Sequence, residues 1–145
     1  MKPLLATLGL LLALTVTSHA RVGETLAELK ARYGEGKSIS PRMADTEQYE
    51  WQKDGYTIQA SLRGNVTVLE FFHRNDTVMT DDDIKALLKV YRKDVRFTWS
   101  TRDNCFKSSD KKLMAGREHG HDDWIYVRDI AATESLSGKG KAGNL

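Results

Sequence analysis

Two tight-turn sequences in the segment from Gln48 to Phe72 constrain the fold more than any other feature of the chain. Asp54-Gly55 and Gly64-Asn65 are typical of two-residue β-hairpin loops, and such loops fix which residues of the flanking strands face each other. Both turns place the same alternate residues on one face of a three-stranded antiparallel meander. That face carries Tyr49, Trp51, Ile58, Ala60, Leu62, Leu69 and Phe71.

The opposite face of this meander is mainly polar. It carries Glu50, Thr57, Gln59, Ser61 and Glu70, with Val66, Val68 and Phe72 among them. Apolar side chains on a polar, solvated face indicate a surface for a partner. Our hypothesis is that Val66, Val68, Phe72, Gln59 and Glu70 form a binding surface. The alternative is that an edge-on second sheet or the C-terminal strands cover these side chains.

Two short amphipathic helices are predicted, one before the meander and one after it. Thr25 and Thr80 each precede an acidic residue three positions later, which is the capping-box pattern of a helix start. The apolar stripes that follow are Leu26, Leu29 and Tyr33 in the first helix, and Ile84, Leu87, Leu88 and Tyr91 in the second. The acids at positions 81–83 resemble a metal cluster, but helix capping explains them better.

Further strands follow the second helix, and together these elements predict the fold class. Strands are expected at 96–101, 113–118 and 124–128, and residues 104–108 are a candidate for a further short strand. Apart from that short strand, a helix followed by three strands occurs in residues 23–73 and again in 80–129. In this tandem repeat Trp51 and Trp99 are predicted to be equivalent. The fold is therefore α+β, an antiparallel sheet with two short helices on one face.

The two ends of the chain differ from the predicted domain. Lys2, the uncharged run from Leu4 to Val16 and the triplet Ser18-His19-Ala20 are typical of a signal peptide cleaved after residue 20. The apolar run has 13 residues, fewer than the roughly 20 that span a bilayer. We expect an exported chain, periplasmic or extracellular, without an integral membrane segment after cleavage. Residues 21–132 form a single domain, and residues 133–145 are predicted to be a disordered tail.

Charge and cysteine content exclude some functions. Removing residues 1–20 takes away one lysine and no acid, which leaves 21 basic and 20 acidic side chains. A nucleic-acid-binding protein would show a basic excess, so no nucleic-acid partner is expected. Cys105 is the only cysteine, so no disulfide forms within the chain, and burial is favoured over a free reactive thiol. No cofactor is predicted, and no catalytic motif assigns a catalytic residue.

One loop has the side chains of a metal site. His119, His121, Asp122 and Asp123 lie within five residues, and imidazoles with carboxylates bind zinc, copper or nickel. A hydrated hairpin loop is the preferred interpretation, because Gly120 and two aspartates are ordinary turn residues. A small metal-dependent or general acid/base hydrolytic enzyme that uses this loop remains the alternative function.

The first half of the chain resembles a known group of small exported proteins. Gly23-x-Thr25-x-x-Glu28-Leu29-x-x-x-Tyr33-Gly34, the aromatic strand at 49–51 and the strand at 66–68 are similar to modules of the outer-membrane assembly lipoprotein (SmpA/OmlA) and β-lactamase-inhibitor-protein type. The resemblance implies helices on one face of an antiparallel sheet and a role in binding proteins. We expect an exported, non-catalytic binding or protein-interaction module, whose partner is another envelope or extracellular protein.

Overall fold

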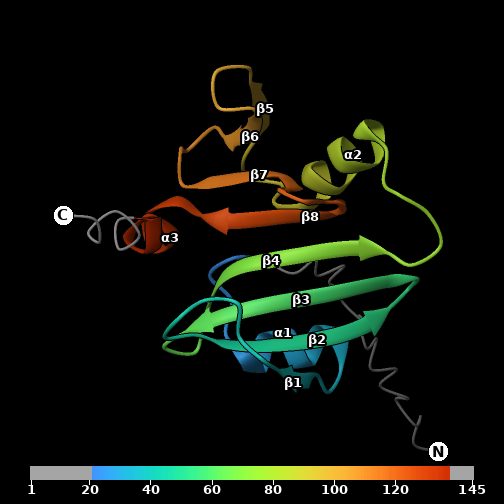
Figure 1. The fold of residues 1–145 in the computed structure, drawn as a ribbon, viewed down its shortest axis with the longest axis vertical. Coiled ribbons are helices and arrows are strands. Elements are labelled where there is room, and N and C mark those ends of the chain that lie inside the picture. The colour runs from blue at the N-terminus through green and yellow to red at the C-terminus, as the bar shows by residue number, and fades with distance from the viewer. Residues whose placement is uncertain (1–20, 138–145) are drawn as a thin grey trace, which may run out of the picture.

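The computed structural model describes residues 21–137, which form one eight-stranded antiparallel sheet with three short helices (Figure 1). The predicted signal peptide, residues 1–20, lies outside the described residues, as does the end of the predicted tail from residue 138. The α+β fold class is confirmed. The elements are α1 (Leu26–Tyr33), β1 (Lys37–Ile39), β2 (Glu47–Lys53), β3 (Tyr56–Arg63), β4 (Val66–Arg74), α2 (Asp81–Tyr91), β5 (Phe97–Ser100), β6 (Cys105–Ser108), β7 (Leu113–Glu118), β8 (His121–Asp129) and α3 (Ile130–Ser137).

The sheet consists of two halves with the same connectivity. Its strand order is β1-β2-β3-β4-β8-β7-β6-β5, so each half is a helix followed by four strands, and the halves meet where β4 pairs with β8 (Figure 1). The sequence predicted three strands per unit and missed β1. The predicted equivalence of Trp51 and Trp99 is wrong, because Trp51 lies on the second strand of its half and Trp99 on the first.

Helices α1 and α2 begin as predicted. In both, the cap threonine accepts a hydrogen bond from the backbone N–H three residues on, and the acidic side chain there accepts one from the backbone N–H of the threonine. Each box satisfies backbone donors that would otherwise lack a partner at the helix start. Both helices pack on one face of the sheet over Trp51, Ile58, Ala60, Leu62 and Phe72.

A β-bulge changes the predicted faces of β4. Both turns are two-residue loops, since Lys53 pairs with Tyr56 and Arg63 with Val66. Between Ser61 and Leu62, however, the register with β4 shifts by one residue. One extra residue moves every later side chain of β4 to the other face. Leu69 and Phe71 therefore lie away from the helices, and Glu70 and Phe72 lie beneath them.

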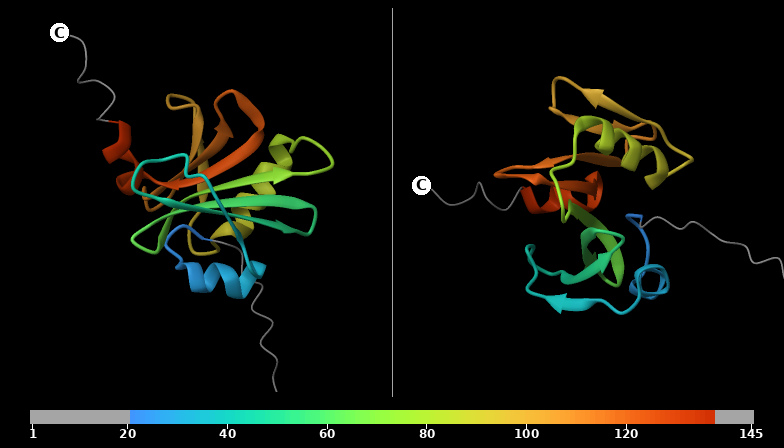
Figure 2. Two further views of the ribbon diagram at one scale, coloured as in Figure 1. Left: turned by 60° about the horizontal axis from the view of Figure 1, so that its bottom comes forward. Right: turned by 90° about the vertical axis from the view of Figure 1, so that its right-hand side faces the viewer.

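The second face of the sheet has its own cover. Val68, Leu69 and Phe71 form a small cluster there with Met43, Trp124, Tyr126 and Ala132. Ala132 belongs to α3, which the sequence did not predict and which lies across the sheet from α1 (Figure 2). Helix α3 runs to Ser137, so the tail predicted to be disordered from residue 133 is helical over its first five residues. The covering segments are the β1–β2 loop and α3.

Candidate functional site

The binding surface predicted from sequence is not a surface. Val68, Phe72, Gln59 and Glu70 are all buried, and Val66 alone is exposed, at 39%. The bulge in β4 turns Glu70 and Phe72 toward the helices, while the β1–β2 loop and α3 help cover the other face. The alternative was cover by an edge-on second sheet or by the C-terminal strands, and of these only β8 contributes to that face within residues 21–137, through Trp124 and Tyr126.

Of the predicted metal loop, His119 lies in the turn between β7 and β8, and His121, Asp122 and Asp123 begin β8. The Asp123 carboxylate lies 3.1 Å from Nε2 of His73, on the neighbouring strand β4. The backbone carbonyl of Asp122 accepts a hydrogen bond from Arg117, and His119 and His121 are exposed. Within residues 21–137, no group of three or more His, Cys, Asp or Glu residues is placed to hold a metal ion.

A buried carboxylate lies at the centre of the molecule. The Tyr91 hydroxyl donates to Oε2 of Glu70 at 2.5 Å and accepts from the backbone N–H of Val22 at 2.7 Å. Burial raises the pKa of Glu70 to about 8. An Arg32–Glu24 ion pair lies between α1 and the segment before it. Glu70 is fully buried and is not among the residues that line four hollows at the surface of residues 21–137.

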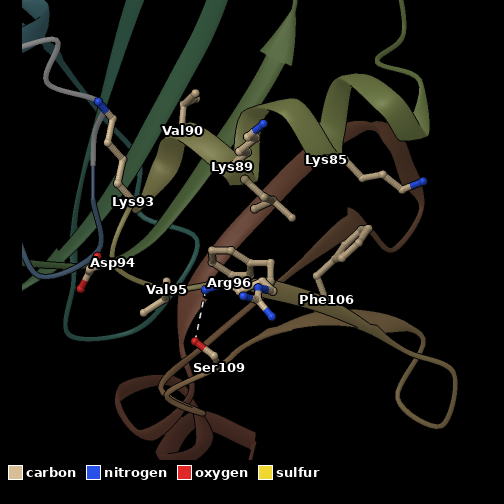
Figure 3. Close-up of a pocket in the computed structure, with 11 residues that line it drawn as sticks. Lys85, Lys89, Val90, Lys93, Asp94, Val95, Arg96, Phe106 and Ser109 are labelled. Atoms are coloured by element: carbon tan, nitrogen blue, oxygen red, sulfur yellow. Dashed lines mark hydrogen bonds between the residues drawn. The ribbon is translucent and has the colours of Figure 1, made fainter.

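A groove along α2 is the best candidate for a functional site. It consists of two hollows of about 910 and 450 Å³ between α2 and strands β5 to β7, and both hollows are lined by Lys85 and Phe106. We call it the α2–β5 groove. Figure 3 shows its larger hollow, with the lysines of α2 above and the residues of β5, β6 and the preceding loop below.

The floor of the α2–β5 groove is aromatic. Trp99 of β5 pairs with Phe106 of β6, and their rings meet edge to face with centroids 5.0 Å apart. Phe97 lies two residues before Trp99 on β5, so it projects to the same side of the sheet. Trp99 is 47% exposed, so a large indole surface faces solvent beside the helix. Rings of this size contribute most of the energy at many binding sites.

The rim of the groove is cationic. Lys85 and Lys89, four residues apart, share one flank of α2. Lys93 lies just beyond the end of the helix and lines the same hollow (Figure 3). Arg96 is held at the base of the groove by its backbone N–H, which donates to Oγ of Ser109 at 3.1 Å. Among the described residues, the charged ends of Lys89, Lys93 and Arg96 have no ion pair or hydrogen bond.

The acidic residues near the groove are already engaged. Hydrogen bonds from Arg92 lower the pKa of Asp94 to about 2, so Asp94 stays charged and bound to that guanidinium. At the other end of α2, Asp81 accepts from Nη2 of Arg117 at 2.9 Å. The cations without a partner among the described residues are therefore concentrated at the end beside Arg96, and the acidic side chain at the start of α2 is already paired with Arg117.

Another hollow, of about 770 Å³, lies between α1 and α2. The cationic side chains Arg74 and Lys53 of this hollow already have partners in the described part of the chain, unlike Lys89, Lys93 and Arg96 of the α2–β5 groove. Arg74 lies 3.3 Å from the Asp83 carboxylate, and the Lys53 ammonium donates to the Arg32 carbonyl at 2.7 Å. This hollow thus offers an anion less free charge than the α2–β5 groove does.

Sequence reasoning did not find the α2–β5 groove, although part of its pattern was visible. Lys85 and Lys89 are four residues apart on a predicted helix, which places them on one flank. The aromatic residues of β5 and β6 come close to that flank only in the folded chain. What the groove can do chemically is bind: it offers positive charge beside aromatic surface, and no nucleophile with a partnered base lies among its lining residues.

Comparison with known proteins shows the fold and nothing finer. No protein-family model matches the chain, and no curated protein matches it. A solved structure with a similar fold is a cysteine-rich secretory protein from Staphylococcus aureus subsp. aureus Mu50, at 11% sequence identity and a TM-score of 0.50. The match covers 80% of this chain and 47% of that one, so this chain spans about half the length of its structural neighbour.

Proposed function

We propose that the chain is an exported, non-catalytic binding module and that its ligand binds in the α2–β5 groove. The observation that carries this proposal is the combination of a solvent-exposed indole, Trp99, with three cations that have no partner among the described residues, Lys89, Lys93 and Arg96. Free cations beside an aromatic floor favour a ligand that is both anionic and apolar.

None of the helices within residues 21–137 is long and apolar enough to cross a membrane. Two features of the sequence support export and a binding role. The signal-peptide pattern of residues 1–20 favours export to the periplasm or the cell exterior. The resemblance of the first half to modules of the SmpA/OmlA and β-lactamase-inhibitor-protein type also favours a module that binds another envelope or extracellular protein.

The groove can be tested with a small probe that combines an aromatic ring system with a negative charge. Anilinonaphthalene sulfonate should bind the native chain in a fluorescence titration. Trp99→Ala and Lys89→Ala should each weaken this binding, by about fivefold or more if each removes roughly 1 kcal/mol of contact energy. Thermal unfolding of each variant verifies that it is folded.

Two control substitutions lie outside the groove. Val66→Ala removes an exposed apolar side chain on β4, and Lys37→Ala removes an exposed lysine on β1. Neither should change probe binding. The proposed site is wrong if the native chain does not bind the probe, or if Trp99→Ala and Lys89→Ala bind it as tightly as the two controls do.

A further inference from the structure

Strand β5 forms one edge of the sheet. It pairs with β6 on one side, and no strand among residues 21–137 pairs with its other side. Charged residues and proline commonly protect an exposed edge strand from pairing with another chain. The four residues of β5, Phe97–Ser100, include neither. At the opposite edge, β1 has three residues and begins with Lys37. The β5 edge is therefore the one suited to receive another strand.

A strand added at this edge would border the α2–β5 groove. Alternate side chains of a β-strand project to the same face of the sheet, and on β5 the side chains of Phe97 and Trp99 project toward the groove. Alternate residues of an added strand would therefore lie beside these rings, below the flank of α2. Main-chain hydrogen bonds would supply affinity, and the groove would supply specificity.

The charges of the groove determine the chemistry of this strand. Lys89, Lys93 and Arg96 line the hollow beside Phe97, whereas the hollow beside Trp99 holds Asp81 already paired with Arg117. The cations without a partner in residues 21–137 are therefore concentrated at the first end, and carboxylates are favoured there because opposite charges attract. The complementary strand has acidic residues near Phe97 and apolar residues near Trp99.

No part of this chain outside the described residues matches that chemistry. Residues 1–20 and 138–145 contain no aspartate and no glutamate, and the latter contain two lysines. The acids Asp81, Asp82 and Asp83 of a second copy belong to the first turn of α2, so they are not on an extended segment. An extended acidic segment of a different protein therefore fits the charges of the groove better than these segments do.

We infer that the α2–β5 groove binds an extended acidic segment of a partner protein, which pairs with β5 as an additional strand and places its carboxylates against Lys89, Lys93 and Arg96. This inference rests on the proposed function, because it specifies the ligand of the same groove.

A library of random nonapeptides, selected on the immobilised full chain, tests the charge requirement. Selected peptides should be enriched in Asp and Glu at one end and should compete with anilinonaphthalene sulfonate for the groove. Lys89→Glu combined with Arg96→Glu should weaken their binding by more than about tenfold, since like charges then face each other. Replacing the acids of a selected peptide with lysine should restore binding to this variant, which also shows that the variant is folded.

Backbone N-methylation tests the strand pairing. Two versions of a selected peptide are methylated at odd or at even positions, and the set whose N–H groups face β5 should lose binding. Hydrogen exchange of the β5 amides should slow when the unmodified peptide binds. If both methylated peptides bind as well as the unmodified one, strand addition is wrong.

Failure of the inference can be distinguished from failure of the proposed function. Probe binding that depends on Trp99 and Lys89, together with a selection that yields no acidic enrichment, leaves the groove as a ligand site and overturns the acidic-peptide inference. Binding to vesicles that contain phosphatidylglycerol, without any acidic peptide, likewise overturns it. Formation of a dimer that Trp99→Ala dissociates would show that a second copy occupies the groove, which also contradicts it.

Discussion

At the scale of single residues, Glu70 shows how one local irregularity changes the chemistry of the core. The bulge in β4 places this carboxylate beneath α2 instead of on the polar face. Its Oε2 accepts from the Tyr91 hydroxyl, and its Oε1 has no hydrogen-bond partner among the described residues. A buried carboxylate with few donors is stabilised when it is protonated, because burial penalises the charged form. This is the physical cause of its raised pKa.

Glu70 should make the protein less stable as the pH rises from acidic to mildly basic. Burial raises its pKa from 4.5 to about 8, so between these values the native state holds a proton that the unfolded state releases. The stabilisation is complete below about pH 4.5 and is lost as the pH rises toward 8. The free energy of unfolding, from urea titrations at pH 5 and pH 8, should fall by up to a few kcal/mol.

Glu70→Gln should reduce this pH dependence, because glutamine does not titrate. Glu47→Gln, on an exposed residue of β2, is the matched control and should leave the dependence unchanged. An equal loss of stability between pH 5 and pH 8 in the wild type and in Glu70→Gln would contradict a protonated Glu70.

At the scale of elements, the capping boxes of α1 and α2 are the features that the sequence predicted best. Both depend on a threonine and on an acidic side chain three residues later, so the whole motif is local. The two hairpin loops are equally local. Asp54, Gly55, Gly64 and Asn65 all have positive φ, the backbone conformation that a type I′ turn requires.

Thr80→Ala should lower the free energy of unfolding by about 1 kcal/mol, the usual effect of losing an N-cap side chain. The substitution removes the hydroxyl that accepts a hydrogen bond from the backbone N–H of Asp83, and with it one of the donors to the Asp83 carboxylate. Chemical denaturation followed by circular dichroism measures the change. Thr77→Ala, on an exposed residue just before the helix, is the control and should have little effect.

The faces of β4 could not be predicted from the sequence, for a physical reason. Hydrophobic alternation fixes the register of a strand only where one face is solvated. In β4 every residue from Thr67 to Phe72 is buried, so apolar side chains occur on both faces and the pattern fits either register. The hydrophobic pattern of such a strand does not reveal a bulge. The predicted binding surface therefore depended on the wrong register.

The α2–β5 groove could not be predicted from the sequence either, although the fold class of the chain could. Its lining comes from α2, β5, β6 and the adjoining strand and loops, which are separate in the sequence and meet only through the sheet topology. The sequence does provide the lysine spacing on α2 and the aromatic residues of β5. Their juxtaposition depends on how far α2 lies from the end strands of the sheet, and no local pattern specifies that distance.

At the scale of the whole molecule, the two halves share one core. Strand β4 of the first half pairs with β8 of the second over five residue pairs. Tyr91 of α2 contacts the first half, since it donates to Glu70 and its ring meets that of Phe72 edge to face at 6.1 Å. Arg63 of β3 donates to the carbonyl of Ala132 in α3. Unfolding of either half would therefore expose apolar side chains of the other half to solvent.

The halves should accordingly unfold in a single cooperative transition, although their topologies repeat. Cys105 is buried in β6, so its labelling by a thiol reagent in rising urea reports the second half. Hydrogen exchange of the β2 and β3 amides reports the first half, and both should give the same midpoint. Phe72→Ala should lower both midpoints together, because removing a buried Phe side chain typically lowers the free energy of unfolding by roughly 3–5 kcal/mol. Val66→Ala, at an exposed position of the same strand, should shift neither by as much. Rapid labelling of Cys105 at urea concentrations where β2 and β3 remain protected would show instead that the second half opens independently, and that contacts across β4 and β8 do not couple the halves.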